Sequence, residues 1–242
     1  MYAMCKVVRD VSIHWLGDFV MINPSRSQSH APPNWEPIVY VVDDDRLMRE
    51  MLSSLFRSVG LRVRLFESAQ ELLQFELEDA PSCLVLDIRM PRLSGFDLQA
   101  EFAKSNIRIP IIFLTGHGDV STSVRAMKAG AVDFLTKPFH EQEMLDAVTA
   151  ALARDQKRCN EERSHSDLQH RFASLSDRER QIMALVTGGL MNKQVASKVG
   201  IAEQTVKIHR GNLMRKMRAK SLADLVLMAE NLGIRGLEQE ES

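Results

Sequence analysis

Residues 83–98 read CLVLDIRMPRLSGFDL. The first five of them, CLVLD, form a continuous apolar run that is typical of a buried parallel strand, and the run ends in Asp87. The residues from Phe96 to Lys104 then follow helical spacing. A buried strand that ends in a carboxylate and leads into a helix predicts one strand–helix unit of an α/β protein.

Similar units lie on both sides of this one. Strands are predicted at 38–42 (IVYVV), 62–66 (RVRLF), 109–115 (IPIIFLT) and 132–137 (VDFLTK). Helical segments are predicted after them, at 47–59, 68–77, 121–129 and 141–153. Five strand–helix units in about 115 residues predict an α/β fold, an open and mostly parallel sheet with helices on both faces.

Polar side chains follow these strands at their carboxyl ends, where function collects in parallel sheets. They are Asp43, Asp44, Asp87, Thr115 and Lys137. Clustered carboxylates repel one another, and a hard divalent cation such as Mg²⁺ or Mn²⁺ removes that penalty. One carboxylate can then attack a phosphoryl donor, while the hydroxyl and the ammonium offset the charge of the transferred group. The alternative is that each polar residue only marks the end of its strand.

Residues 175–236 carry a different pattern, with four helical segments. Ser176 and Glu179 form a capping box at the start of the first. Three more segments follow, at 192–199, 203–217 and 222–231. A short helix, a turn with Gly200 and a second helix rich in lysine and arginine predict a helix-turn-helix that binds the major groove of DNA. A plain helical hairpin with a solvated basic face is the alternative.

The charge is divided unevenly between these two regions. The chain of 242 residues has a formal net charge of −1. Residues 37–150 hold 12 basic and 17 acidic residues, whereas residues 165–235 hold 12 basic and 6 acidic residues. An acidic region suits cations and a basic region suits the phosphate backbone of nucleic acid, so the two regions are expected to have different partners.

The composition excludes several classes of protein. With 45% hydrophobic and 26% charged residues, the chain is not disordered throughout. No apolar run approaches the ~18 residues of a membrane-spanning helix, so no membrane partner is expected. Three cysteines form no CxxC pair, which argues against a zinc finger or a disulfide framework and predicts a reducing, cytoplasmic location.

Four motifs, VVDDD, LVLDIRMPRLSGFDL, IIFLTGHGD and MKAGAVDFLTKPF, together resemble the receiver domain of bacterial two-component response regulators over residues 37–153. The resemblance implies a flavodoxin-like (βα)₅ fold. It also implies a sensor histidine kinase as partner, and stoichiometric phosphorylation with at most slow self-dephosphorylation instead of enzymatic turnover.

The same resemblance implies roles for single residues. Asp87 is the expected phosphoacceptor. Asp43 and Asp44 are expected to hold Mg²⁺, with Asp44, Asp87 and the backbone carbonyl of Arg89 as direct ligands. Asp45 is not required by the pattern, and a solvated position at a helix start is expected for it.

Three further positions match the pattern on the last two strands. Thr115 is the expected switch hydroxyl, and Lys137 is expected to contact the phosphoryl group and to precede a cis peptide bond to Pro138. Phe134 occupies the place of the switch aromatic, although its residue type is equally typical of a core position.

Residues 175–236 resemble the four-helix DNA-binding domain of the LuxR family. The combination with the receiver pattern resembles most the FixJ/NodW branch of the NarL-type regulators. Residues 192–199 are then the scaffold helix, residues 203–217 the recognition helix, and the last helix the expected dimer contact. The family usually has Ser or Thr where Ala202 stands, and losing that cap is expected to cost ~1 kcal/mol.

The same resemblance implies which side chains touch DNA. Base contacts are implied for Lys207, Ile208 and Gly211. Phosphate contacts are implied for Arg210, Lys216 and Lys193. Since Gly211 has no side chain, base reading by that residue is the least supported of these contacts.

The sequence thus predicts a disordered extension (1–36), a receiver domain (37–153), a helical linker (154–174), a LuxR-type domain (175–236) and an acidic tail (237–242). Phosphorylation of Asp87 is expected to control binding to paired half-sites in promoter DNA, either through homodimerisation or through release of the DNA-binding domain, with RNA polymerase as a further partner. One alternative is a DNA-binding regulator that needs no phosphorylation. Another is a Mg²⁺-dependent phosphohydrolase, although the run Asp43–Arg46 lacks the DxDx[TV] motif of such enzymes.

Overall fold

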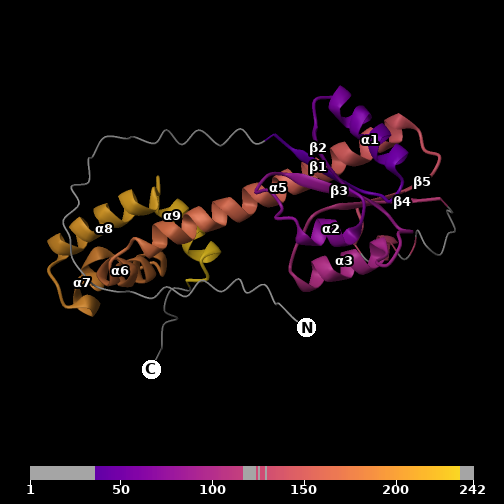
Figure 1. The fold of residues 1–242 in the computed structure, drawn as a ribbon. Coiled ribbons are helices and arrows are strands. Elements are labelled where there is room, and N and C mark those ends of the chain that lie inside the picture. The colour runs from indigo at the N-terminus through magenta and orange to yellow at the C-terminus, as the bar shows by residue number, and fades with distance from the viewer. Residues whose placement is uncertain (1–35, 117–123, 125, 129, 235–242) are drawn as a thin grey trace, which may run out of the picture. The chain divides into compact units, whose positions relative to one another are not determined.

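The computed structural model describes residues 36–116, 124, 126–128 and 130–234. Within these residues the chain forms an α/β domain followed by a helical domain (Figure 1). The predicted extension up to residue 35, most of the predicted helix 121–129 and the acidic tail 237–242 lie outside the described residues.

The α/β domain is built on one parallel sheet with the strand order β2-β1-β3-β4-β5. The strands are β1 (Ile38–Val42), β2 (Arg62–Phe66), β3 (Ser82–Asp87), β4 (Ile111–Thr115) and β5 (Asp133–Thr136). Every residue of β1, β3 and β4 is buried, as expected for strands covered on both faces. The predicted α/β fold is therefore confirmed, and β4 and β5 are shorter than their predicted ranges.

Two apolar cores hold helices against the two faces of the sheet (Figure 1). Helix α1 (Arg46–Ser58) and the first turns of α5 (Glu141–Ala173) cover one face. Helices α2 (Ala69–Gln74) and α3 (Gly95–Lys104) cover the other. Because β1 and β3 are neighbours, with Val42 in register with Leu86, the residues that follow these strands come out side by side.

Side-chain caps fix where the first three helices begin. Asp45, Ser68 and Ser94 each accept a hydrogen bond from a backbone N–H in the first turn of the helix that follows. Helix α2 ends at Gln74, short of the predicted end at Leu77. The reason is packing, because Phe75 is extended and its ring lies 5.3 Å from that of Phe66.

Helix α5 is longer than the sequence predicted. The helical character predicted for the linker 154–174 is confirmed up to Ala173, but the expected end of the preceding helix near Ala153 is wrong, because one helix runs without a break from Glu141 to Ala173. The carboxylate of Asp155 is fully buried and accepts a hydrogen bond from the N–H of Ser82 at 2.8 Å, so the helix remains packed on the sheet beyond residue 153. Both described cysteines, Cys83 in β3 and Cys159 in α5, are buried in this region.

The helical domain contains α6 (Asp177–Thr187), α7 (Asn192–Val199), α8 (Glu203–Met217) and α9 (Leu222–Asn231). These bounds agree closely with the predicted segments. Gly200 ends α7 with a left-handed φ of 71°, which makes the tight turn into α8. Val206, Leu213 and Met217 of α8 are fully buried in the core of this domain, which leaves the opposite face of α8 exposed.

Candidate functional sites

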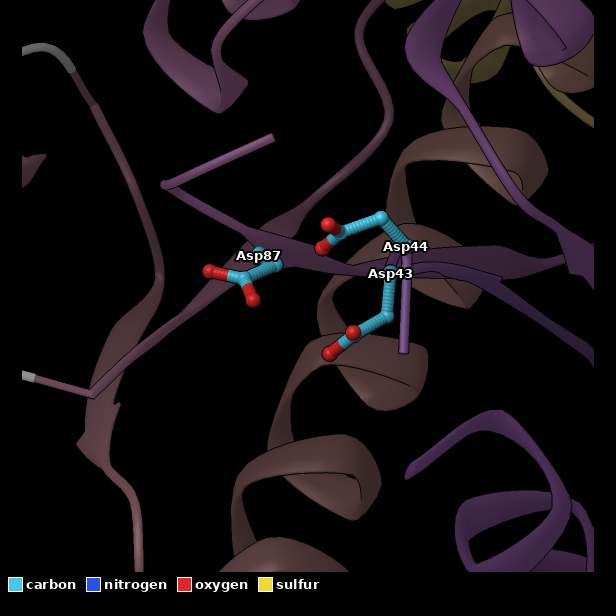
Figure 2. Close-up of side chains that lie close together, drawn as sticks. All are labelled: Asp43, Asp44 and Asp87. Carbon is cyan, nitrogen blue, oxygen red and sulfur yellow. The ribbon is translucent and has the colours of Figure 1, made fainter. Parts of the chain in front are cut away.

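Three carboxylates meet at the carboxyl ends of β1 and β3. One oxygen atom from each of Asp43, Asp44 and Asp87 lies within 4.8 Å of the other two (Figure 2). Asp43 is buried, Asp44 is exposed, and the side chain of Asp87 is 10% exposed. We refer to these three side chains as the carboxylate cluster.

The ammonium of Lys137 connects two members of the carboxylate cluster. Its Nζ atom lies 2.7 Å from Oδ2 of Asp43 and 2.6 Å from Oδ2 of Asp87. The backbone N–H of Lys137 donates to the carbonyl of Thr115 at 2.7 Å, and the peptide bond to Pro138 is cis, as the resemblance implied. Thr115 is buried at the end of β4, so the five polar residues predicted at this edge of the sheet do converge there.

The surroundings shift the pKa values of two of these groups in the same direction. Burial raises the pKa of Asp43 above its usual value, although hydrogen bonds from Lys137 and from the N–H of Asp45 oppose the change. Burial alone would lower the pKa of Lys137, but its hydrogen bonds to Asp43 and Asp87 outweigh this effect and raise it. The ammonium is therefore held in its charged form between two acids.

Backbone contacts fix the orientation of Asp87. Its Oδ1 atom accepts a hydrogen bond from the N–H of Arg89 at 3.0 Å. Gly95, at the start of α3, lies so close that a Cβ atom there would be 2.6 Å from the carbonyl oxygen of Asp87 and 3.1 Å from Phe113. A glycine at this position allows α3 to begin directly beside the strand end.

The donor set of this site fits a hard divalent cation. Carboxylate oxygens are the ligands that Mg²⁺ and Mn²⁺ prefer, and the exposed Asp44 leaves one side of the cluster open to solvent. Lys137 offsets one of the three negative charges, so two remain for a cation to neutralise.

Phe134 lies on β5, half-buried against the core, and its predicted switch role stays a prediction.

The structure confirms the expected solvated position of Asp45 at the start of α1, and it adds one contact that sequence reasoning missed. Asp45 caps α1, and Arg49 donates from its guanidinium to the carbonyl oxygens of Asp43 and Asp44. The guanidinium contacts reach back six and five residues, from α1 to the end of β1, and no spacing rule in the sequence indicates them.

The exposed face of α8 carries the side chains predicted to contact bases. Ile208 is 58% exposed, which is unusual for an isoleucine in a packed domain. Lys207 is exposed and lies 3.3 Å from Glu203 on the same helix. A Cβ atom on Gly211 would meet nothing within 4 Å, so the surface around it is open.

The residues predicted to contact phosphates differ in their surroundings. Lys193 is exposed at the start of α7. Arg210 is half-buried and donates to the side-chain oxygen of Asn192 at 2.9 Å, which ties α8 to α7. Lys216 lies 2.6 Å from the buried Glu179 of α6, so its ammonium already serves an ion pair inside the domain.

Comparisons with known proteins match two families to two separate parts of the chain. The response regulator receiver domain family matches residues 39–149, and the luxR family of bacterial regulatory proteins matches residues 173–229. Nodulation protein W of Bradyrhizobium diazoefficiens is 57% identical over 213 residues, which cover 88% of this chain and 94% of that protein. The chain belongs to the NarL/FixJ family of response regulators, in its FixJ/NodW branch.

Other members of the NarL/FixJ family support the assignment. The response regulator protein TodT of Pseudomonas putida is 48% identical over 196 residues, covering 81% of this chain and 86% of that protein. The low-resolution structure of the response regulator StyR has a TM-score of 0.75 and 47% identity, covering 81% of this chain and 98% of that chain.

Membership in the NarL/FixJ family gives the general function of the chain. The chain is a two-component transcriptional regulator with a receiver domain and a LuxR-type DNA-binding domain. Its relatives are transcriptional regulators and not enzymes, which argues against the phosphohydrolase alternative. Among the described residues, no helix is both long enough and apolar enough to cross a membrane.

Proposed function

We propose that this response regulator accepts a phosphoryl group on Asp87 from a sensor histidine kinase, and that the modification controls its binding to promoter DNA. The observation that carries the proposal is the Lys137 ammonium shared by Asp43 and Asp87, at 2.7 and 2.6 Å. It supplies positive charge at the place where an incoming phosphoryl group needs it.

Exposure favours Asp87 over Asp43 as the nucleophile. Each oxygen of both carboxylates accepts a hydrogen bond, so hydrogen bonding does not separate the two residues, but the Asp43 side chain is fully buried. Asp87 keeps 10% of its side chain exposed. In the transfer, a carboxylate oxygen of Asp87 forms a bond to phosphorus while the bond from phosphorus to the kinase histidine nitrogen breaks.

The remaining residues of the site assist this transfer. Asp43, Asp44, Asp87 and the carbonyl of Arg89 would hold Mg²⁺ or Mn²⁺, which neutralises charge on the phosphoryl oxygens when bound. The Lys137 ammonium pairs with the Asp87 carboxylate before the transfer and with the negatively charged phosphoryl group after it. The Thr115 hydroxyl donates to a phosphoryl oxygen, and Phe134 repacks in response.

The phosphorylated regulator then acts on DNA as a homodimer. Helix α9 leaves Leu222 and Leu227 exposed, at 40% and 59%, and these apolar side chains suit a contact between two copies. Two recognition helices would engage half-sites about one helical turn apart. Contact with RNA polymerase and the exact domain bounds, 37–153 for the receiver and 175–236 for the LuxR-type domain, stay predictions.

The α8 surface divides the work of DNA recognition among its side chains. Lys207 can donate to base edges, exposed Ile208 can pack against thymine methyl groups, and Gly211 lets the groove wall approach closely. Lys193 and Arg210 contribute phosphate contacts. Lys216, which pairs with Glu179, contributes less to DNA binding than these two.

Phosphorylation is tested with a small acyl phosphate donor and Mg²⁺. The full chain is incubated with acetyl phosphate, and its intact mass and labelled peptide are measured. One phosphoryl group per chain is expected, on Asp87, and Asp87→Asn is expected to abolish the label. Asp45→Asn is the matched control, because Asp45 caps α1 and is not part of the carboxylate cluster. A label on another residue, or none, would contradict the proposal.

DNA binding is tested on duplexes selected from a random library by the acetyl-phosphate-treated chain. Lys193→Ala is expected to weaken binding to all sequences alike and to reduce the salt dependence by about one phosphate contact. Ile208→Ala is expected to lose affinity mainly for sites that contain the preferred thymines. Lys157→Ala, exposed on α5, is the control. If Asp87→Ala binds DNA as the treated wild type does, regulation without phosphorylation is the better account.

A further inference from the structure

One arginine binds every main-chain carbonyl of the Asp43–Asp45 run. The guanidinium Nη1 of Arg49 donates to the carbonyl oxygen of Asp43 at 2.6 Å and to that of Asp44 at 3.1 Å. The backbone N–H of Arg49 donates to the carbonyl of Asp45 at 3.1 Å. The turn between β1 and α1 is therefore closed by a single residue from the first turns of the helix.

These contacts matter most for Asp44. Asp43 and Asp87 are each oriented by Lys137 and by a backbone N–H. Among the residues that the structure describes, none forms a hydrogen bond or ion pair with the Asp44 carboxylate. Its direction toward the cluster is set by the backbone that carries it, and the carbonyl of that backbone is bound by Arg49.

We propose that Arg49 is a positioning residue for the divalent cation site, because it fixes the main chain from which Asp43 and Asp44 project. The inference rests on the proposed function, since it concerns the cation that the carboxylate cluster would bind. Arg49 itself offers no oxygen ligand, so its effect on a cation comes entirely through the two aspartates. Groups that orient ligands in this way strongly affect metal affinity.

Charge and geometry give Arg49 opposite effects, which makes the proposal decidable. The guanidinium is a cation and repels a divalent ion, so its removal would tighten binding if charge dominated. Its hydrogen bonds hold the ligands in place, so removal weakens binding if geometry dominates. Arg49→Lys keeps the charge but loses the forked donors, whereas Arg49→Ala loses both.

The experiment measures equilibrium binding of Mn²⁺ to the full chain by electron paramagnetic resonance of the free ion. Arg49→Ala is expected to raise the Kd about tenfold, and Arg49→Lys to raise it by a smaller factor. Arg46→Ala is the matched control, because Arg46 lies on the same helix and pairs with the exposed Glu50. Its Kd is expected to stay within about twofold of the wild type.

A second readout separates positioning from general stability. The rate of labelling by acetyl phosphate is measured against Mg²⁺ concentration. Arg49→Ala is expected to shift the half-saturating Mg²⁺ concentration upward by the same factor as the Mn²⁺ Kd, and to leave the rate at saturating Mg²⁺ close to the wild-type rate. If Arg49→Ala unfolds at the assay temperature, Arg49→Lys carries the test.

The outcomes distinguish failure of this inference from failure of the site. If the wild type binds Mn²⁺ and Asp44→Asn does not, the cation site stands. Unchanged or tighter binding by Arg49→Ala would then overturn the role of Arg49 alone. If the wild type binds no Mn²⁺, or Asp44→Asn binds it equally well, the proposed cation site fails and the role of Arg49 fails with it.

Discussion

The buried carboxylate of Asp155 accepts a hydrogen bond from the backbone N–H of Ser82 at 2.8 Å, across 73 residues of sequence. Ser82 is the first residue of β3, and Asp87 is the last. The other Asp155 oxygen pairs with Arg158 at 2.8 Å. Helix α5 is therefore attached, beyond residue 153, to the strand that carries the proposed phosphoacceptor.

Removing this attachment is expected to destabilise the receiver domain. Asp155→Ala leaves the Ser82 N–H without its acceptor and Arg158 without its buried partner, at an expected cost of about 2–3 kcal/mol in the free energy of unfolding. Urea denaturation followed by circular dichroism measures the change. Asp167→Ala, at an exposed position of the same helix, is the control and should change stability little. Equal effects of the two variants would contradict the structural role of Asp155.

Gly95 is expected to tolerate no side chain. Gly95→Ala would place Cβ 2.6 Å from the Asp87 carbonyl oxygen, so α3 or the strand end has to move, at about 1–3 kcal/mol. We also expect slower labelling of Asp87 by acetyl phosphate, because the displaced atoms belong to the phosphoacceptor. Gly211→Ala is the contrasting variant, since space is open there and a helical Ala is favoured over Gly by about 0.5–1 kcal/mol. If both variants gain stability, the close approach at Gly95 is wrong.

The ion pair between Glu179 and Lys216 predicts acid sensitivity of the LuxR-type domain. Burial alone would raise the pKa of Glu179, but hydrogen bonds from Lys216 and Ser176 outweigh it and hold the pKa below the usual 4.5. A carboxyl with a lowered folded-state pKa stabilises the fold above its unfolded pKa, and this stability is lost as pH falls through the folded value. The stability advantage of wild type over Glu179→Gln should therefore be full above about pH 5 and shrink below about 4.5. Calorimetric unfolding of both chains across this range tests it, and a constant difference would contradict it.

Helix α8, the expected recognition helix, lacks the side-chain cap that α1, α3, α6 and α9 have. Ala202 stands at the N-cap of α8 and offers no side-chain hydrogen bond, while Ser221 caps α9 by accepting from the N–H of Asp224 at 3.1 Å. Ala202→Ser is expected to stabilise the domain by about 1 kcal/mol, and Ser221→Ala to destabilise it by a similar amount. Thermal unfolding of both variants measures the pair of effects. An unchanged Ala202→Ser variant beside a weakened Ser221→Ala variant would show that another group already satisfies the start of α8.

Much of the fold could be predicted because its signals are local. Strands 38–42 and 62–66 and the expected recognition helix 203–217 have the bounds that residue pattern alone indicated. The convergence of Asp43, Asp87 and Lys137 followed from a general property of parallel sheets, whose carboxyl ends share one edge.

The features that sequence could not supply depend on contacts between distant residues. The attachment of α5 to the sheet beyond residue 153 depends on Asp155 meeting Ser82, and nothing in a charged, glycine-free stretch indicates where such a helix stops. The family resemblance implied a phosphate contact for Lys216. In the structure its ammonium pairs with Glu179, which lies 37 residues earlier in the chain. The hydrogen bonds from Arg49 to the carbonyls of Asp43 and Asp44 join residues that are close in sequence. They depend on the direction of the Arg49 side chain, which the sequence pattern does not specify.

The two buried cysteines give this protein a built-in reporter. Burial raises the thiol pKa of both Cys83 and Cys159, so neither presents a reactive thiolate while its surroundings are closed. An alkylating reagent can therefore modify each thiol only when its surroundings open, at the centre of the sheet for Cys83 and along α5 beyond residue 153 for Cys159. Alkylation measured peptide by peptide would follow the opening around each cysteine separately, in the native protein and without an engineered probe.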